Sequence, residues 1–405
     1  MARTIAGLPA GMRVTDGIGL GVVTKTFPLP LIRQLLAETD RTSQRERELP
    51  AHVMVYYVIA LALYMQVSYR EVLRCLLEGL RWLGGPDTVL HAASPAGISQ
   101  ARTRLGAAPV RRLYEMVVGP IATAATPGAW YRGQRVVSLD GTTLDVADTQ
   151  ANTQAFGRPA SARGANATGA FPQLRLVGLV ETGTHVVFGA TLAPYATSEA
   201  TLARAVLPAL RPDMVCLADR YFLGFDLWQQ AAATGAALVW RAKASQRFPM
   251  EGRCADGSYR STLRWNHHCR ATDRTPLPVR VIEYTLPGVP DADPSYRLVT
   301  TLLDPATAPA AELAALYHER WEIEGAFDEL KTHLRGARIV LRSKTPELVR
   351  QEAYGLLLAH FAVRGLMHEA ALAASPQARD PDTLSFVHAV RVIRRTLPRV
   401  AALPP

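Results

Sequence analysis

The segment from Leu316 to Lys331, LYHERWEIEGAFDELK, sets the tightest limits on the fold. At 100° per residue, one helix face spanning an arc of about 80° carries Tyr317, Arg320, Glu324, Asp328 and Lys331. An apolar stripe beside that face is formed by Leu316, Ile323, Phe327, Leu330 and Leu334. The pattern predicts a helix that packs on a core, turns its polar face to a rim and leaves Glu319, Glu322 and Glu329 in water. An ordinary i,i+4 ion pair between Arg320 and Glu324 is the alternative interpretation.

The spacing within this helix adds a second constraint. Tyr317, Arg320, Glu324 and Lys331 resemble the Y-R-E-K signature of the cut-and-paste transposases of the insertion element four family. The resemblance implies an RNase H-like catalytic core in which Glu324 is the last member of a D-D-E metal-binding triad. Two aspartates, each following a strand, should therefore lie upstream.

Two aspartates meet this expectation. Asp140 follows the short β-branched run 134–139 and opens DGTT, and Asp219 follows the buried run 214–218 and opens DRYF. Both settings are similar to those of the family. Because ligands gather at the carboxyl ends of strands in open α/β sheets, we predict that Asp140, Asp219 and Glu324 form one catalytic site. The rival acids are Asp145, Asp148, Asp226 and Asp328.

The expected fold class is α/β. Residues 28–118 are helical in pattern, and a strand, two strands, a helix and a strand follow from residue 134. This order predicts an RNase H-like mixed sheet flanked by helices, and the resemblance implies a β-rich insertion before the last catalytic helix. The predicted divisions are a flexible arm at 1–27, an all-helical N-terminal DNA-binding domain at 28–118, a linker at 119–133, the first part of the core at 134–242 with a loop at 149–170, the insertion at 243–303, the second part of the core at 304–345 and C-terminal helices at 346–405.

A unit of helix-turn-helix size lies at residues 94–117. Its inward residues would be Ile98, Ala101 and Leu105. The residues left to meet DNA would be Gln100, Arg102, Thr103 and Arg104. A plain helical hairpin with solvated arginines is the alternative, and the resemblance to the family favours the DNA-binding interpretation.

The formal net charge of +10 favours double-stranded DNA as the partner. Charge alone is ambiguous, because only four of the 45 basic residues are lysine and the arginine excess is typical of a GC-rich genome. Further candidate DNA contacts are Arg220, Lys243, Trp265, Arg342 and Lys344. As alternatives, Arg220 could pair with a neighbouring acid, Trp265 could lie in the core, and Arg342 and Lys344 could be solvated.

Three carboxylates suit the hard ions Mg²⁺ or Mn²⁺, and two such ions can activate the attacking water and stabilise the leaving oxygen. Without metal the carboxylates repel, so we expect a loose site or raised carboxylate pKa values. Arg320 and Lys331 would bind phosphate, and Tyr317 would donate a hydrogen bond to a phosphate oxygen.

The function expected from this resemblance is cleavage of transposon ends and their joining to target DNA, with a homodimer in the synaptic complex. A host nuclease and a non-catalytic regulator derived from a transposase are the alternatives. The four cysteines show no CxxC spacing, and neither a signal peptide nor a membrane span is evident, so we expect a cytoplasmic, nucleoid-associated protein with no membrane contact.

Overall fold

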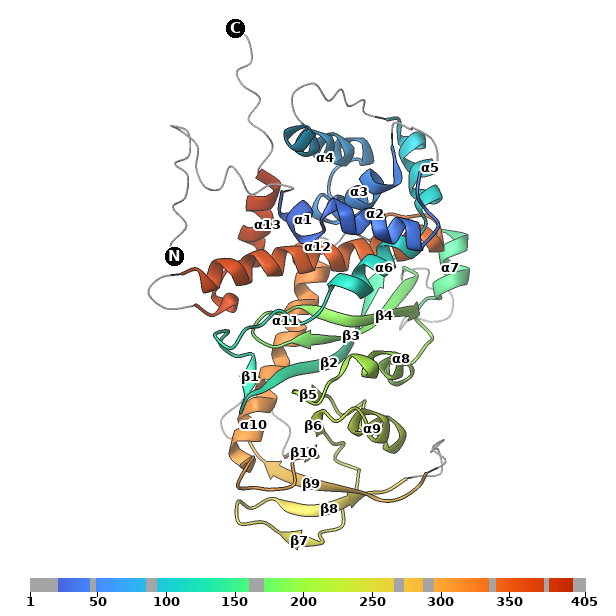
Figure 1. Ribbon diagram of the computed structural model, residues 1–405. Helices are drawn as coiled ribbons and strands as arrows, with labels where there is room; N and C mark the ends of the chain where they lie inside the picture. The colour runs from blue at the N-terminus through green and yellow to red at the C-terminus, as the bar shows by residue number, and fades with distance from the viewer. Residues whose placement is uncertain are drawn as a thin grey trace.

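A ten-stranded sheet organises the computed structural model, which describes residues 21–43, 49–84, 93–159, 171–265, 273–286, 295–334, 340–374 and 379–395 (Figure 1). The strand order is β4-β3-β2-β5-β6-β10-β9-β8-β7, and β1 pairs with β2 outside this path. The strands are β1 (Trp130–Tyr131), β2 (Gln134–Asp145), β3 (Gln173–Glu181), β4 (Val187–Pro194), β5 (Met214–Ala218), β6 (Ala237–Arg241), β7 (Gly252–Arg253), β8 (Tyr259–Leu263), β9 (Leu277–Tyr284) and β10 (Tyr296–Thr300).

The first five strands of the path give the RNase H-like arrangement. Strands β2, β3 and β4 form an antiparallel meander, and β5 and β6 then add parallel to β2. Helix α8 (Glu199–Val206), with the short 3-10 turn Leu207–Ala209, leads into β5, and α9 (Phe225–Ala232) connects β5 to β6. The predicted fold class is confirmed by this topology.

The β-rich segment between β6 and the last catalytic helix extends the same sheet. Strand β10 pairs antiparallel with β6, and β9, β8 and β7 follow outward from it. The segment inserted in the sequence is therefore continuous with the core sheet by backbone hydrogen bonding.

Helices cover both faces of the sheet. Strand residues alternate between the faces, so Val215 and Leu217 pack with Leu313 of helix α10 (Ala310–His318). On the other face Trp228 of α9 meets Trp240 edge to face, with ring centroids 5.2 Å apart. Figure 1 shows α8 and α9 on one side of the strands and the α10–α11 rod on the other.

The helical N-terminal region packs on the long helix α12 (Pro346–Leu372). Its helices are α1 (Gly21–Thr26), α2 (Leu29–Glu38), α3 (Ala51–Leu63), α4 (Tyr69–Gly84), α5 (Pro95–Leu105) and α6 (Ala108–Val117). Its buried side chains belong to one continuous core with α12 and the sheet. The flexible arm predicted for 1–27 is corrected over its last part, because Val22 and Val23 of α1 are buried in that core.

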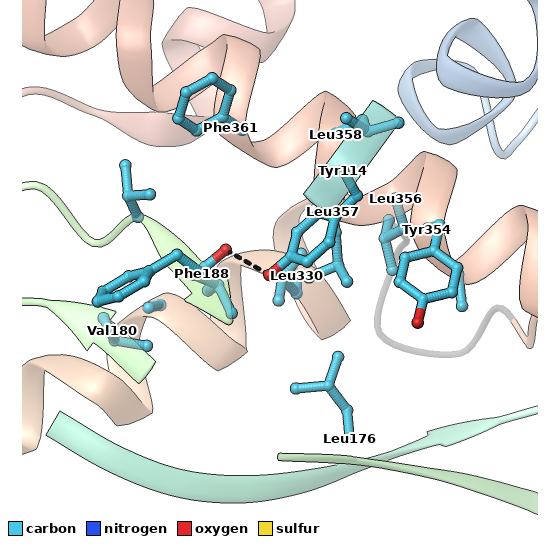
Figure 2. Close-up of a cluster of buried hydrophobic side chains, with 14 of the residues drawn as sticks. Tyr114, Leu176, Val180, Phe188, Leu330, Tyr354, Leu356, Leu357, Leu358 and Phe361 are labelled. Carbon is cyan, nitrogen blue, oxygen red and sulfur yellow. Dashed lines mark hydrogen bonds between the residues drawn. The ribbon is translucent and has the colours of Figure 1, made fainter. Parts of the chain in front are cut away.

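A shared hydrophobic cluster joins these layers (Figure 2). Tyr114 of α6 points between α12 and the sheet, and its hydroxyl donates to the Val187 carbonyl at 3.1 Å. Its ring lies 5.6 Å from that of Tyr354 on α12. This packing fixes the helical region against the catalytic sheet.

Two smaller segments complete the described chain. The segment 149–170, predicted as a loop, begins with helix α7 (Gln150–Phe156). Thr149 caps this helix by accepting a hydrogen bond from the Asn152 amide. Residues 160–170 lie outside the described residues. After α12 come the 3-10 turn η5 (Pro381–Thr383) and α13 (Phe386–Arg395). None of the described helices has the length and hydropathy that a membrane span requires.

Candidate active site

Two aspartates lie side by side where the parallel pairing of β2 with β5 stops. The last paired residues are Leu139 on β2 and Ala218 on β5, and Asp140 and Asp219 come directly after them. Two neighbouring parallel strands thus deliver their carboxylates to the same edge. This is the position at which ligands bind in open α/β sheets.

The structure corrects one detail of the prediction for Asp140. The apolar run ends at Leu139, but β2 continues to Asp145, paired only with β3. Beyond Leu139 the strand has lost β5 as a neighbour, so polar side chains can face the open edge. The change in sequence pattern marks the end of the parallel pairing and not the end of the strand.

The Asp140 carboxyl is electrostatically strained. Its pKa is raised to about 6, chiefly by burial, and the negative charges of Asp219 and Glu199 contribute to this rise. The Gly141 amide, which donates to Oδ1 at 2.7 Å, and the Arg320 guanidinium oppose this rise. The negative charges of Asp140, Asp219 and Glu199 are therefore only partly balanced by the Arg320 guanidinium and the Gly141 amide.

The rod that carries the Y-R-E-K residues is continuous but irregular. It consists of α10, the 3-10 turn η3 (Glu319–Trp321), α11 (Glu322–Asp328) and the π-helical turn η4 (Glu329–Leu334). The prediction of one regular helix is corrected here. Tighter and wider turns rotate later residues away from the positions that a uniform 100° step assigns.

Arg320 connects this rod to the aspartates. Its Nη1 lies 3.3 Å from Asp140 Oδ2, and its Nη2 lies 3.8 Å from Glu324 Oε1. The Arg320 side chain is 11% exposed and that of Glu324 is 54% exposed. The i,i+4 ion pair is thus present, and it is part of a bridge between the first and third residues of the predicted triad.

Tyr317 and Lys331 attach the rod to two strands. The buried Tyr317 hydroxyl donates to the Ala218 carbonyl at 3.3 Å, and Lys331 Nζ donates to Thr142 Oγ1 at 3.1 Å. Because Tyr317 is buried and its hydroxyl is engaged, the expectation that it reaches a phosphate oxygen is corrected. Its contact instead fixes the residue that precedes Asp219.

The donor set of the triad suits a hard divalent ion, since all three side chains offer carboxylate oxygens. Asp140, Asp219 and Glu324 are not gathered into a tight cluster, because Arg320 lies between Asp140 and Glu324. Over the described ranges, the one set of three acidic, histidine or cysteine ligand atoms lying within 4.8 Å of one another is His185, Glu322 and Asp382.

That second group corrects the prediction that Glu322 and Glu329 face water. Glu329 is 7% exposed, and the Glu322 side chain accepts from the Gly183 amide at 2.6 Å. The wide π-helical turn directs Glu329 toward α12, where Arg364 Nε donates to it at 2.8 Å. We call the group the His185 cluster, which comprises His185, Glu322, Glu329, His360, Arg364 and Asp382.

Two of the predicted DNA contacts, Arg220 and Lys243, lie beside the exposed ring of Tyr221. Lys243 Nζ lies 5.4 Å and the Arg220 guanidinium 6.0 Å from the ring centroid of Tyr221. The Tyr221 amide also donates to Asp219 Oδ1 at 2.8 Å. Cations and a 66% exposed ring therefore stand beside the second aspartate.

Two other predicted DNA contacts, Trp265 and Lys344, are also exposed. Trp265 is 41% exposed and meets Phe225 edge to face, with centroids 6.4 Å apart. The Lys344 side chain is exposed, while its carbonyl accepts from Thr149 Oγ1 at 2.9 Å. Both side chains are therefore available to a ligand.

Two arginines expected to meet DNA are internal instead. Arg342 Nη1 donates to the Val67 carbonyl in the helical region. Arg102 is 2% exposed, and its guanidinium donates to Gln351 Oε1 and Ser343 Oγ, both at 2.9 Å. The expectations that Arg342 and Arg102 contact DNA are corrected, because these side chains join the helical region to the catalytic half. The prediction for the rest of α5 is in part confirmed, since the inward residues Ile98, Ala101 and Leu105 are buried and Gln100, Thr103 and Arg104 are exposed.

Three residues of the site were missed by the sequence reasoning. Tyr221 and Trp321 are exposed aromatics next to Arg220 and Arg320, and Glu199 adds a carboxylate near Asp140. Tyr221 and Trp321 each follow a predicted DNA-contacting arginine in the sequence, so this adjacency could have identified them as candidate site residues. Glu199 carried no such signal, because its position depends on how α8 packs against β2.

An RNase H-like sheet with two aspartates at the edge of its parallel strands is typical of metal-dependent nucleic-acid enzymes. Comparison with known protein families agrees with this class. Residues 131–362 match the Transposase DDE domain family, and residues 18–115 match the family described as Insertion element 4 transposase N-terminal. The chain belongs to the DDE transposases of the insertion element 4 type. It is a DNA-cleaving transposase that depends on a divalent metal, as members of this class are.

Particular relatives are consistent with that assignment. The chain is 27% identical over 370 residues to "Transposase InsG for insertion sequence element IS4" of Escherichia coli (strain K12), covering 91% of this chain and 80% of that protein. It is 24% identical over 221 residues to "Putative transposase InsZ" of the same organism, covering 53% and 68%. A piggyBac transposase synaptic complex with hairpin DNA aligns with a TM-score of 0.45 at 11% identity, covering 96% of this chain and 84% of that one.

Proposed function

We propose that this transposase acts by cut-and-paste transposition: it binds the terminal inverted repeats of its insertion sequence, hydrolyses the phosphodiester at each end and joins the ends to target DNA. The strongest support is the placement of Asp140 and Asp219 on adjacent parallel strands, with Arg320 connecting Asp140 to Glu324. In the part of the chain that the structure describes, no feature favours the host-nuclease or the regulator alternative.

The proposed metal ligands are Asp140, Asp219 and Glu324, with two Mg²⁺ or Mn²⁺ ions as the cofactor. When bound, such ions supply an activated water and neutralise the leaving oxygen. The raised pKa of Asp140 fits this assignment, because a group of carboxylates without enough compensating charge favours a bound cation. Asp219 is oriented for this role by the Tyr221 amide.

The other residues of the rod would position DNA. Arg320 is a planar donor that can exchange a carboxylate partner for a phosphate oxygen. Lys331, beside Thr142 of β2, would act as a point charge on the strand that crosses the edge of the sheet. Tyr317 would contribute indirectly by holding the Ala218 carbonyl in place.

Recognition of the transposon ends is assigned to the helical region. The exposed side chains of Gln100, Thr103 and Arg104 lie together on α5, whose opposite face is buried. A basic and polar helix face of this kind suits a DNA groove. We propose that two copies of the chain hold two ends in the synaptic complex, and that the enzyme acts on DNA of the nucleoid.

A cleavage assay with labelled terminal DNA tests the function. The purified chain should nick DNA carrying the matched terminal repeat only when Mg²⁺ or Mn²⁺ is added, and should join the released 3′ end to a second duplex. A scrambled terminal sequence should not be cut. Strand joining separates a transposase from a nuclease, and complete absence of cleavage would favour the regulator.

Glu324→Gln should abolish cleavage and preserve end binding, because the side chain is exposed and contributes charge to the site rather than packing. Asp328→Asn is the matched control, since this carboxylate lies one turn later and is 53% exposed. The assignment of the third ligand would be wrong if Asp328→Asn abolished cleavage and Glu324→Gln did not.

A further inference from the structure

The His185 cluster contains three potential metal ligands from three separate segments. His185 lies in the β3–β4 turn, Glu322 begins α11, and Asp382 lies in η5. One ligand atom from each lies within 4.8 Å of the other two. The position is distinct from the triad, although Glu322 precedes Glu324 by two residues.

The His185 imidazole has a buried nitrogen without a hydrogen-bond partner. His185 is 8% exposed, and its Nε2 is buried and makes no hydrogen bond. This atom nevertheless lies 3.2 Å from Asp382 Oδ1 and 3.7 Å from Glu322 Oε2. Two ligands of a tetrahedral Zn²⁺, each about 2.0–2.1 Å from the ion, are separated by roughly 3.3 Å. The spacing therefore suits coordination.

The other imidazole nitrogen has the partner that metal-bound histidines require. His185 Nδ1 lies 3.3 Å from Glu329 Oε1. A carboxylate that accepts from Nδ1–H fixes the tautomer and turns the Nε2 lone pair outward, as at many zinc sites. Glu329 in turn accepts from Arg364 Nε at 2.8 Å, so its own position is fixed.

The charges of the cluster leave room for a divalent cation. Glu322, Glu329 and Asp382 contribute three carboxylates, and among the described residues Arg364 is the permanently charged side chain that pairs with Glu329 and Asp382; its Nη1 lies 3.4 Å from Asp382 Oδ1. His360, which faces Glu329 at 2.9 Å, has a lowered pKa because of burial and so stays neutral. Burial raises the pKa of Glu322 to about 8, so a bound cation would displace the proton of this carboxyl, and two negative charges would then remain with His185 neutral. An ion of charge +2 balances them.

We propose that His185, Glu322 and Asp382 bind one divalent transition-metal ion of the Zn²⁺ type. The imidazole favours such an ion over Mg²⁺, which prefers oxygen ligands alone. The bound ion joins the β3–β4 turn, the helix that carries Glu324 and the segment after α12. It thereby holds the start of α11 in a fixed position beside the catalytic site.

The alternative arrangement for the same atoms is a network without metal. Arg364 Nη2 also contacts His185 Nδ1, and if Nδ1 accepts from it, Nε2 carries the proton and faces Asp382. Burial lowers the pKa of His185, but the nearby carboxylates of Asp382 and Glu329 outweigh this and raise it to about 9. Protons can thus replace the cation, and the experiment must separate the two states.

Metal binding is measured on the full chain carrying Asp140→Asn and Glu324→Gln, so that the catalytic carboxylates do not contribute. After removal of bound metals with a chelator, Co²⁺ is titrated and its visible absorption is followed. We expect one ion per chain with the spectrum of a four- or five-coordinate site, displacement by Zn²⁺, and a higher melting temperature with Zn²⁺.

Three further variants in that background identify the ligands. His185→Gln and Asp382→Asn should each weaken binding more than about a hundredfold, since loss of an outer partner alone costs 10- to 100-fold. Because Asp382 is exposed, we expect Asp382→Asn to fold normally. It therefore tests the site even if His185→Gln, a change at a buried position, fails to fold. His388→Gln removes an exposed imidazole six residues after Asp382 in the sequence and should leave binding unchanged.

Three results of the metal titrations overturn the proposal. They are no stoichiometric binding, binding that both ligand variants retain, and binding that His388→Gln abolishes. An NMR spectrum in which His185 Nε2 stays protonated in excess Zn²⁺ contradicts it equally. Each result is independent of cleavage activity, so failure here would leave the proposed function standing.

Discussion

Asp140 and Asp219 each stand one residue beyond the same pair of the parallel ladder, Leu139 with Ala218. This register places both carboxylates at one edge, and Asp219 contributes to the raised pKa of Asp140. The metal-free site is therefore held in an unfavourable electrostatic state by the strands themselves. Such strain is expected where a cation is to bind.

Removing the Asp140 charge should stabilise the metal-free protein at neutral pH. The pKa of Asp140 is raised from 3.8 to about 6. The contribution of its protonated carboxyl to the free energy of unfolding is therefore fully present below about pH 4 and is lost as the pH rises through 6. Asp140→Asn cannot ionise and should gain about 2 kcal/mol over the wild type at pH 8, after allowance for the lost Arg320 contact.

Thermal unfolding in chelator at pH 3.5 and pH 8 checks this prediction. The advantage of Asp140→Asn should be present at pH 8 and absent at pH 3.5. An equal loss of stability at both values would mean that the carboxyl is satisfied in the folded state and that the strain is not real.

Arg102→Ala should destabilise the protein rather than reduce DNA binding directly. The change removes the donors to Gln351 Oε1 and Ser343 Oγ from a buried site and should cost about 3 kcal/mol of unfolding free energy. Chemical denaturation measures this loss. Arg104→Ala is the matched control on the same helix: its exposed side chain should affect end binding and leave stability within about 0.5 kcal/mol. The reverse pattern would restore the original interpretation of Arg102.

Tyr317→Phe separates positioning from phosphate binding. The variant loses the hydrogen bond to the Ala218 carbonyl, worth about 1 kcal/mol, and loosens the residue next to Asp219. We expect slower cleavage with unchanged affinity for terminal DNA, measured by single-turnover kinetics and a binding titration. A loss of affinity with an unchanged cleavage rate would indicate that Tyr317 contacts the phosphate after all.

Lys331→Ala should weaken binding to DNA ends in a salt-dependent way. If Lys331 neutralises one phosphate, the slope of log K against log salt should fall by about 0.9. Lys25→Ala is the control, because Lys25 pairs with Glu369 at 2.6 Å on the helical side of the molecule. Identical slopes for the wild type and Lys331→Ala would exclude a phosphate contact.

The fold was accessible from the sequence because local patterns and the family resemblance agreed. The apolar runs before Asp140 and Asp219 predicted strands, and most helix boundaries in the N-terminal region follow their proline and glycine residues. The long-range pairing of β10 with β6 had no local signal, so the inserted strands were not expected to continue the sheet.

The site was less predictable where it depended on helix geometry or on distant partners. A uniform helical step placed Glu329 in water, whereas the π-helical turn buries it against Arg364. The sequence predicts that Arg102 and Arg342 are surface cations, because the groups that accept their hydrogen bonds are distant in sequence and leave no local pattern. Buried arginines in an arginine-rich chain cannot be separated from exposed ones by composition.

The most direct measurement is anomalous scattering from Mn²⁺ in crystals of the full chain bound to terminal DNA. The proposed mechanism predicts metal peaks coordinated jointly by Asp140, Asp219 and Glu324, with Arg320 moved away from Asp140. Strong peaks elsewhere, with none within coordination distance of these three carboxylates, would contradict it.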